Sequence, residues 1–196
     1  MHKYEDNINK FQPLISDALN YDIILQPMIS EKSKPKYGLI RAILDAKTLS
    51  YHTEHINDEY VSKDTQVKRI KNALYNDFTN NIYYNLLGGA LINSPLTYNI
   101  LHESLIDKKN DIKYGLLEYI SDYLCVDIHI IYSRKKSIKY HRYGKKESPY
   151  FHKNRDSILV FFYHDVYYLV LAQITDSAFD AYFTYDSEII EDVKLI

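Results

Sequence analysis

The hydrophobic pattern of this chain changes its period near residue 125, and this change limits the possible folds more than any other feature. Between Tyr37 and Leu124, apolar residues recur every three or four positions, which predicts a series of helices. After Cys125, the segments VDIHIIY, ILVFFY and YYLVLAQ alternate or are continuously apolar, and they are rich in β-branched and aromatic residues, which predicts strands. Helices followed by strands favour an α+β domain, with the helices packed on a small, mostly antiparallel sheet.

Helices are predicted at residues 37–49, 64–78, 81–91, 95–105 and 112–124, and strands at 126–132, 137–143, 158–163 and 167–173. His164 and Asp165 are expected to form the turn of a hairpin. Residues 1–34 show no clear period and contain the turn-forming pair Gln26-Pro27, so they are expected to be an irregular N-terminal arm. Residues 35–173 are expected to form the domain, and residues 174–196 an acidic, aromatic C-terminal tail.

Charge and composition argue against a general affinity for nucleic acids or membranes. The formal net charge is −2 at neutral pH. The longest apolar stretch, Ile158 to Ala172, is interrupted by His164-Asp165 and is too short to span a bilayer, and the N-terminus lacks the apolar core of a signal peptide. The single cysteine, Cys125, cannot form an intramolecular disulfide, which favours a reducing compartment. We therefore expect a soluble cytoplasmic protein.

The amino-acid bias suggests the kind of source. The chain has 21 Tyr, no Trp and only 5 Gly, and it is rich in Asn, Lys and Ile. Such a bias is typical of AT-rich coding sequences, as in many large DNA viruses. It predicts a viral protein that resides in the host-cell cytoplasm, in the virion, or in both.

Two segments carry a resemblance to a known family. The sequence PKYGLIRA at residues 35–42 resembles the DGNCLFRA motif of the OTU cysteine proteases, in which the Cys is the nucleophile and opens a helix. Its second half is matched by Leu39-Ile40-Arg41-Ala42, whereas Gly38 stands at the Cys position. In the hairpin ILVFFYHDVYYLVLAQ, the family's His, Tyr and orienting positions fall on Tyr167, Tyr168 and Leu169. The resemblance covers about residues 35–173 and implies a fold of the OTU/papain-like cysteine protease type.

The residues at these positions cannot support the family's chemistry. A cysteine protease needs a thiolate, a histidine that holds it ionised, and a group that orients the histidine. Gly38 has no side chain, Tyr167 is a poor base because a phenol titrates near pH 10, and Leu169 cannot orient anything. The sequence thus predicts vestigial catalytic positions and a degenerate relative without enzymatic activity.

Cys125 is the thiol that could act as a displaced nucleophile. It lies at the predicted C-terminal end of a helix, where the helix dipole disfavours a thiolate, and its neighbours Leu124 and Val126 are apolar. A small buried hydrophobic residue is the simpler interpretation. His129 is expected on the solvent face of its strand, and His164 in a turn. An active OTU-like deubiquitinase or cysteine protease with a displaced nucleophile remains the alternative.

Neither a metal nor a cofactor is predicted. His52 and His55 could share one helix face, but structural zinc needs four ligands and no Cys pair is present, so a solvated helix end is favoured. Gly88-Gly89 lacks the Lys-Ser/Thr of a phosphate-binding loop.

Two charged segments are the predicted binding surfaces, and each mixes charges with aromatic residues. The basic hairpin carries Arg134, Lys135, Lys136, Lys139, Arg142, Lys145 and Lys146, and the acidic tail carries Phe179, Tyr182 and Phe183. The tail is expected to dock on the basic hairpin of its own chain or on a neighbouring subunit. Alternatively, the hairpin binds nucleic acid or is a solvated edge protected by its lysines.

The predicted function is therefore a non-catalytic protein-interaction or structural module, such as a minor virion component. Capsid or core proteins, or a ubiquitin-like protein, are the expected partners. Nucleic acid is the less favoured partner, and no membrane association is expected.

Overall fold

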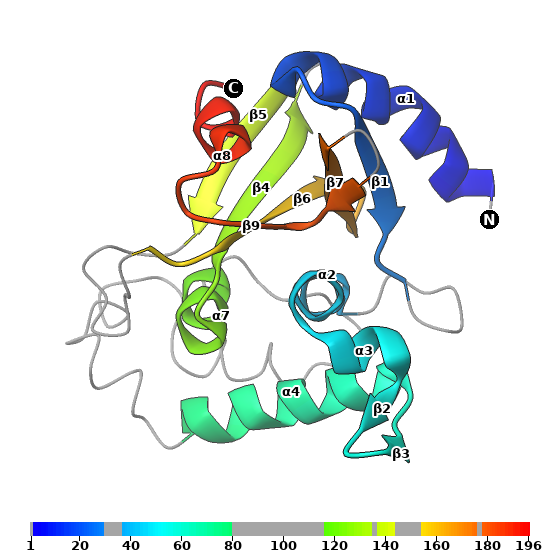
Figure 1. Ribbon diagram of the computed structural model, residues 1–196, viewed down its shortest axis with the longest axis vertical. Coiled ribbons are helices and arrows are strands. Elements are labelled where there is room, and N and C mark those ends of the chain that lie inside the picture. The colour runs from blue at the N-terminus through cyan, green and yellow to red at the C-terminus, as the bar shows by residue number, and fades with distance from the viewer. Residues whose placement is uncertain (1, 30–36, 80–115, 135–136, 144–153, 176–177) are drawn as a thin grey trace.

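The computed structural model describes residues 2–29, 37–79, 116–134, 137–143, 154–175 and 178–196 (Figure 1). In the first half of the chain the elements are α1 (His2–Leu19), β1 (Ile23–Pro27), α2 (Gly38–Lys47), α3 (Leu49–Thr53), β2 (His55–Ile56), β3 (Glu59–Tyr60) and α4 (Lys63–Thr79). In the second half they are α7 (Leu117–Leu124), β4 (Asp127–Arg134), β5 (Ser137–Tyr143), β6 (Ser157–Tyr163), β7 (Val166–Thr175), β8 (Ala178–Asp180), β9 (Tyr182–Phe183) and α8 (Glu188–Val193). The helices predicted at 81–91 and 95–105 lie outside the described residues.

The main sheet has the order β1-β7-β6-β4-β5, and β8 and β9 extend it by pairing with β7 and β6. Its pairs are antiparallel except for β4 and β6, which run parallel. His164 and Asp165 join β6 to β7 with φ values of 49° and 61°, and two positive φ angles match a tight hairpin to the twist of its strands. The predicted α+β class with a mostly antiparallel sheet is confirmed.

The sheet is covered on both faces, and the alternation along β7 assigns each face its helices. Tyr167 and Leu169 belong to the apolar cluster that contains α2, α4 and α7. Tyr168 and Val170 belong to the second cluster, which contains α1 and α8. Figure 1 shows the two layers, with α2, α4 and α7 on one side of the strands and α1 and α8 on the other.

The expectation of an irregular N-terminal arm is wrong, because residues 2–29 form a helix and a strand of the main sheet. Helix α1 buries the stripe Phe11, Ile15 and Leu19 against the second cluster. Its four-residue spacing is visible in the sequence, but Pro13 interrupts the helical pattern. Strand β1 pairs with β7 in spite of Pro27, which ends it at the edge of the sheet, where a missing N–H is tolerated.

Helix α1 also protects this edge of the sheet. Met28 N–H donates to Tyr167 O at 2.9 Å, so the alternation of an antiparallel pair turns the N–H of Leu25 away from β7. The side chain of Gln12 meets it, and Gln12 Oε1 accepts from Leu25 N–H at 3.0 Å. The N–H of Leu25, which faces away from β7, is therefore hydrogen-bonded within the chain. Pro27 has no N–H group with which another strand could pair.

The C-terminal tail docks on its own chain. Strand β8 pairs with β7 and β9 with β6, so the tail extends the main sheet. Phe183, Ile189, Ile190 and Val193 are buried in the second cluster beside α1. The tail therefore docks within its own chain, but its strands pair with β6 and β7 and not with the basic hairpin that the sequence analysis predicted.

Candidate functional site

The first candidate site is the junction where α2 begins beside β7. A Cβ atom added to Gly38 would lie 3.2 Å from Tyr167 Cβ and 3.2 Å from Met28 O, which is closer than ordinary van der Waals contact. The helix that follows Gly38 therefore packs directly on the strand that follows Val166, as the sequence predicted. The two positions that the sequence resemblance pairs are neighbours in space although 129 positions separate them in the sequence.

The surroundings of this junction are closed and mostly apolar. Tyr167 and Leu169 are buried, and the Tyr167 ring centre lies 4.7 Å from that of Phe162. Tyr37 precedes α2 in the left-handed conformation, with φ of 56°, which is uncommon for a bulky residue. Lys71 Nζ donates to its hydroxyl at 2.9 Å and lies 4.3 Å from its ring centre. Neither α2 nor β7 carries a cysteine or a histidine.

A small polar cavity of about 230 Å³ flanks the same helix. It is lined in part by Arg41 and Asp45, whose charges are used within the chain. Arg41 forms an ion pair with Asp64 at the start of α4. Asp45 accepts from Gln26 at 3.0 Å and lies 3.9 Å from Lys63 Nζ. These contacts tie α2 to β1 and α4, and they account for the buried charges of this flank.

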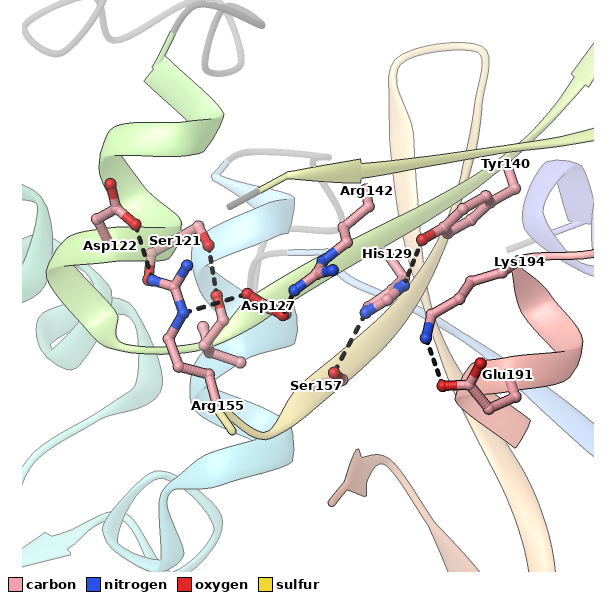
Figure 2. A network of polar contacts seen from close by, with 11 residues as sticks. Ser121, Asp122, Asp127, His129, Tyr140, Arg142, Arg155, Ser157, Glu191 and Lys194 are labelled. Atoms are coloured by element: carbon pink, nitrogen blue, oxygen red, sulfur yellow. Dashed lines mark hydrogen bonds and ion pairs between the residues drawn. The ribbon is translucent and has the colours of Figure 1, made fainter. Parts of the chain in front are cut away.

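The second candidate site lies on the opposite face of the sheet, beneath α8 (Figure 2). It is a cavity of about 400 Å³, and most of the residues that line it are polar or charged. The lining comes from β4, β5, the start of β6 and the C-terminal segment, and consists of Asp127, His129, Arg142, Asn154, Arg155, Ser157, Tyr185, Ile190, Glu191 and Lys194.

A buried ion network forms one wall of this cavity. Arg155 Nη1 lies 2.7 Å from Asp122 Oδ1 in α7, and Arg155 Nε lies 3.2 Å from Asp127 Oδ1 in β4. The side chains of Arg155 and Asp122 have no exposed surface. Arg142 also forms an ion pair with Asp127. Paired charges of this kind join α7 to the sheet, and removal of one partner would leave a buried charge uncompensated.

His129 forms a second polar group beside this wall. Its Nε2 lies 3.2 Å from Ser157 Oγ, and its Nδ1 lies 3.0 Å from Tyr140 Oη. Burial, with the nearby charges of Arg142 and Lys194, lowers the pKa of His129 to about 3. The imidazole is therefore neutral at pH 7 and a weak base, so its contact with Ser157 does not make an activated nucleophile.

The expected position of His129 on a solvent face is wrong, because the residue is fully buried. Strand β4 is an inner strand, flanked by β5 and β6, and both of its faces are covered. An alternating pattern reveals which residues share a face, but it does not reveal that the second face is also covered.

The basic hairpin differs from its predicted form. Arg142 is partly buried and paired with Asp127, so it belongs to the cavity and not to an exposed surface. Arg155, from the same basic stretch, is buried. Lys139 is exposed on β5, as predicted. The side chain of Arg134 and the whole of Lys135, Lys136, Lys145 and Lys146 lie outside the described residues.

The aromatic residues of the tail divide between core and surface. Phe183 is buried, which removes it from the predicted binding surface, whereas Phe179 on β8 is 41% exposed. Tyr182 is partly buried, and burial together with Asp156 raises its pKa to about 12. The tail therefore offers much less free aromatic surface than its sequence indicates.

Cys125 ends α7 as its C-cap, with φ of 52°, and it is partly buried. This is the location that the sequence predicted, at the C-terminal end of a helix. Within the described residues, no three His, Cys, Asp or Glu side chains gather where they could hold a metal ion. None of the helices in these ranges has the length and apolarity required to cross a membrane.

Comparisons with known proteins give a likeness to solved structures and none to a known family. No protein-family profile and no curated protein matches the sequence. Among solved structures, the chain is similar to one described as an ovarian tumor (OTU) domain in complex with ubiquitin, with a TM-score of 0.48 and 13% sequence identity. The alignment covers 87% of this chain and 80% of that chain.

Proposed function

We propose that this chain is a non-catalytic protein-interaction module built on an OTU-like fold. The contact between Gly38 and Tyr167 carries this proposal. It brings together the helix start and the strand that the sequence resemblance pairs in a protease active site, with neither a thiol nor an imidazole present. Formation of a covalent intermediate requires a nucleophile and an adjacent base, and Gly38 and Tyr167 supply neither.

The close packing of the junction supports the same proposal. A side chain at position 38 would meet Tyr167 and the backbone carbonyl of Met28 at 3.2 Å, so the space beside the helix start is already filled. A substrate peptide would need that space. The packing of these described residues thus supports a junction that does not admit a substrate.

The outer edge of β5 is the surface we propose for a partner. Within the described ranges, β4 is the strand that pairs with β5, and the other edge of β5 has no pairing strand. Lys139 and His141 on β5 are exposed. An extended acidic segment could add to such an edge by main-chain hydrogen bonds, and Lys139 would repel a second copy of the same strand.

The predicted partners also belong to this proposal. Capsid or core proteins of a virion, or a ubiquitin-like protein, are the partners it favours. Co-purification of the chain with virus particles at high copy number tests the virion role. Identification of the co-purified proteins by mass spectrometry, for the native chain and for Lys139→Glu/His141→Glu, tests the edge of β5, because charge reversal should remove an acidic partner.

A thiol-reactive ubiquitin probe tests the absence of catalysis. We expect no covalent labelling of the native chain and no cleavage of ubiquitin chains. Cys125→Ser is the matched control, since labelling that this change abolishes would establish a displaced nucleophile and overturn the proposal. The double variant Gly38→Cys/Tyr167→His should also stay unlabelled while the junction is packed as described.

Restoring a polar residue at position 169 would not test the absence of catalysis. Leu169 is buried at 1% exposure in the apolar cluster beneath α2. An aspartate there would be an uncompensated charge in the core, at a cost of several kcal/mol. We expect the triple variant Gly38→Cys/Tyr167→His/Leu169→Asp to unfold, so its inactivity would carry no information.

A further inference from the structure

The cavity beneath α8 has no part in the proposed function, and its lining has the composition of a ligand site. Its volume of about 400 Å³ falls within the range of small-molecule pockets, about 300–1,000 Å³. The neutral imidazole of His129, the hydroxyl of Ser157 and the cations Arg142 and Lys194 all border it. The α2–β7 junction lies on the other face of the sheet, so the two regions are independent.

The cations of the cavity differ in how firmly they are held. Arg155 is fully buried between Asp122 and Asp127 and is fixed by them. Lys194 pairs with Glu191 three positions earlier in the sequence, and these side chains are 36% and 64% exposed. An exposed pair of this kind contributes about 0–1 kcal/mol, so Glu191 can leave Lys194 at little cost.

Arg142 supplies a buried donor to the same cavity. One of its terminal nitrogens pairs with Asp127. Its Nε has no hydrogen-bond partner among the described residues and no accessible surface, but the side chain as a whole is 30% exposed, so a rotation of the guanidinium would present this donor to the cavity. A buried donor without an acceptor costs about 1–3 kcal/mol, and a ligand oxygen would remove that cost.

We propose that this cavity binds a small organic carboxylate, with the Nε of Arg142 and the Nζ of Lys194 donating to it. The charges determine the class of ligand. Asp122 and Asp127 balance the two arginines, so displacement of Glu191 leaves one uncompensated cation, Lys194. A single negative charge matches this balance. A phosphate dianion would bring a second charge toward Asp127 with no cation to offset it.

The electrostatics at His129 agree with this assignment. Arg142 and Lys194 are the charged groups that help burial to lower the pKa of this imidazole, so the potential beside the ring is positive. A carboxylate bound between these cations would offset that potential and raise the pKa of His129. The ring resonances of His129 are therefore a direct reporter of occupancy.

Benzoate, compared with the neutral and similarly shaped benzamide, is the probe we choose for the folded full-length chain. Benzoate should shift the His129 ring resonances saturably, and benzamide should not. Lys194→Gln should weaken benzoate binding by about tenfold or more, which corresponds to about 1.4 kcal/mol. Glu191→Gln should strengthen binding, because it removes the internal competitor. The exposed Lys68→Gln on α4 is the control that should change nothing.

A short peptide with a free C-terminal carboxylate, compared with its amide, distinguishes the source of the group. Tighter binding of the acid peptide than of benzoate would identify a chain terminus as the ligand, and the reverse order would identify a free small acid. The proposal is overturned if benzoate does not saturate, if neither Lys194→Gln nor Glu191→Gln alters binding, or if inorganic phosphate binds in its place.

Discussion

The two candidate sites, on opposite faces of the sheet, have opposite chemical characters. On the face beneath α2, the contact between Gly38 and Tyr167 is apolar and leaves no space for an added side chain. On the face beneath α8, a cavity of about 400 Å³ is lined by buried or partly buried charges and by His129. The contact between α2 and β7 lies where the sequence resemblance places an active site, but Gly38 and Tyr167 carry neither a thiol nor an imidazole. The other site has polar chemistry at a location that no motif identifies.

This difference shows that the place a motif identifies and the place with the capacity to bind need not coincide. A sequence motif identifies where a family places its site, and here it correctly identified two elements that lie together. The capacity to bind is decided by the donors, charges and space present, and these lie on the other face. A motif match therefore locates neighbouring elements of a fold, and a binding site has to be argued separately from the donors, charges and space at each place.

The C-terminal tail closes the polar face, and its removal is the strongest test of the comparison. Phe183, Ile189, Ile190 and Val193 are buried. At about 1.5–3 kcal/mol each, their burial contributes on the order of 6–12 kcal/mol, which is comparable with the whole stability of a domain. Deletion of residues 176–196 should therefore abolish cooperative unfolding in urea. Leu195→Ser, at a residue that is 85% exposed, is the control.

A truncated chain that still unfolds cooperatively, with unchanged stability, would mean that the tail is not part of the core. The polar cavity would then lack its cover, and the proposed carboxylate site would be lost with it.

The ion network of the polar face gives the next largest effect. Arg155→Met should destabilise the fold by about 3–5 kcal/mol, because Asp122 would keep a buried charge without its partner. Lys139→Met on the exposed part of β5 should change stability by about 0.5 kcal/mol or less. Urea denaturation of both variants measures the difference. Equal effects would show that the network is solvated, contrary to its described burial.

The sequence predicted the fold where its patterns were long and local. The helices at α2 and α4 and the strands β4 to β7 were all indicated by their periodicity. It failed at α1 and β1, where Pro13 and the Gln26-Pro27 pair hid a helix and an edge strand. The stripe Phe11, Ile15 and Leu19 would have revealed α1, since proline in a helix can be tolerated on an exposed face.

The polar cavity could not be predicted, because its parts are distant in sequence and each has an ordinary local role. Arg142 and Arg155 belong to a basic stretch that suggests an exposed surface. Their acidic partners are Asp122 and Asp127, which flank the end of α7. Nothing in the sequence connects these two carboxylates with the basic stretch. Pairing of these charges depends on the parallel alignment of β4 with β6, which places Asp127 beside Ser157, two residues after Arg155. A parallel pair of strands leaves no local signal.

The pH dependence of stability sharpens the contrast at His129. Its pKa is about 3 in the folded chain and near 6.5 when unfolded. Between these values the unfolded chain binds more protons, so the contribution of His129 is complete above pH 6.5 and is lost as the pH falls toward 3. From pH 7 to pH 5 the loss should be about 2 kcal/mol. His129→Gln should remove this share of the pH dependence in urea titrations, and an unchanged slope would contradict the buried neutral imidazole.

The smallest expected effect tests the other face, at the contact that carries the proposed function. Gly38→Ala should destabilise the fold by about 1–2 kcal/mol, because the new methyl group would meet Tyr167 and Met28 O at 3.2 Å and the neighbours would have to shift. Tyr167→Ala should cost more alone, since it leaves a cavity. In the Tyr167→Ala background, however, Gly38→Ala should cost less, because the contact with Tyr167 Cδ2 is gone while those with Met28 O and the Cβ of residue 167 remain. Urea denaturation of the four proteins gives the coupling free energy, which should reach about 0.5–1 kcal/mol. Strict additivity would mean that the Tyr167 ring does not fill the space beside position 38, which would contradict the packed junction.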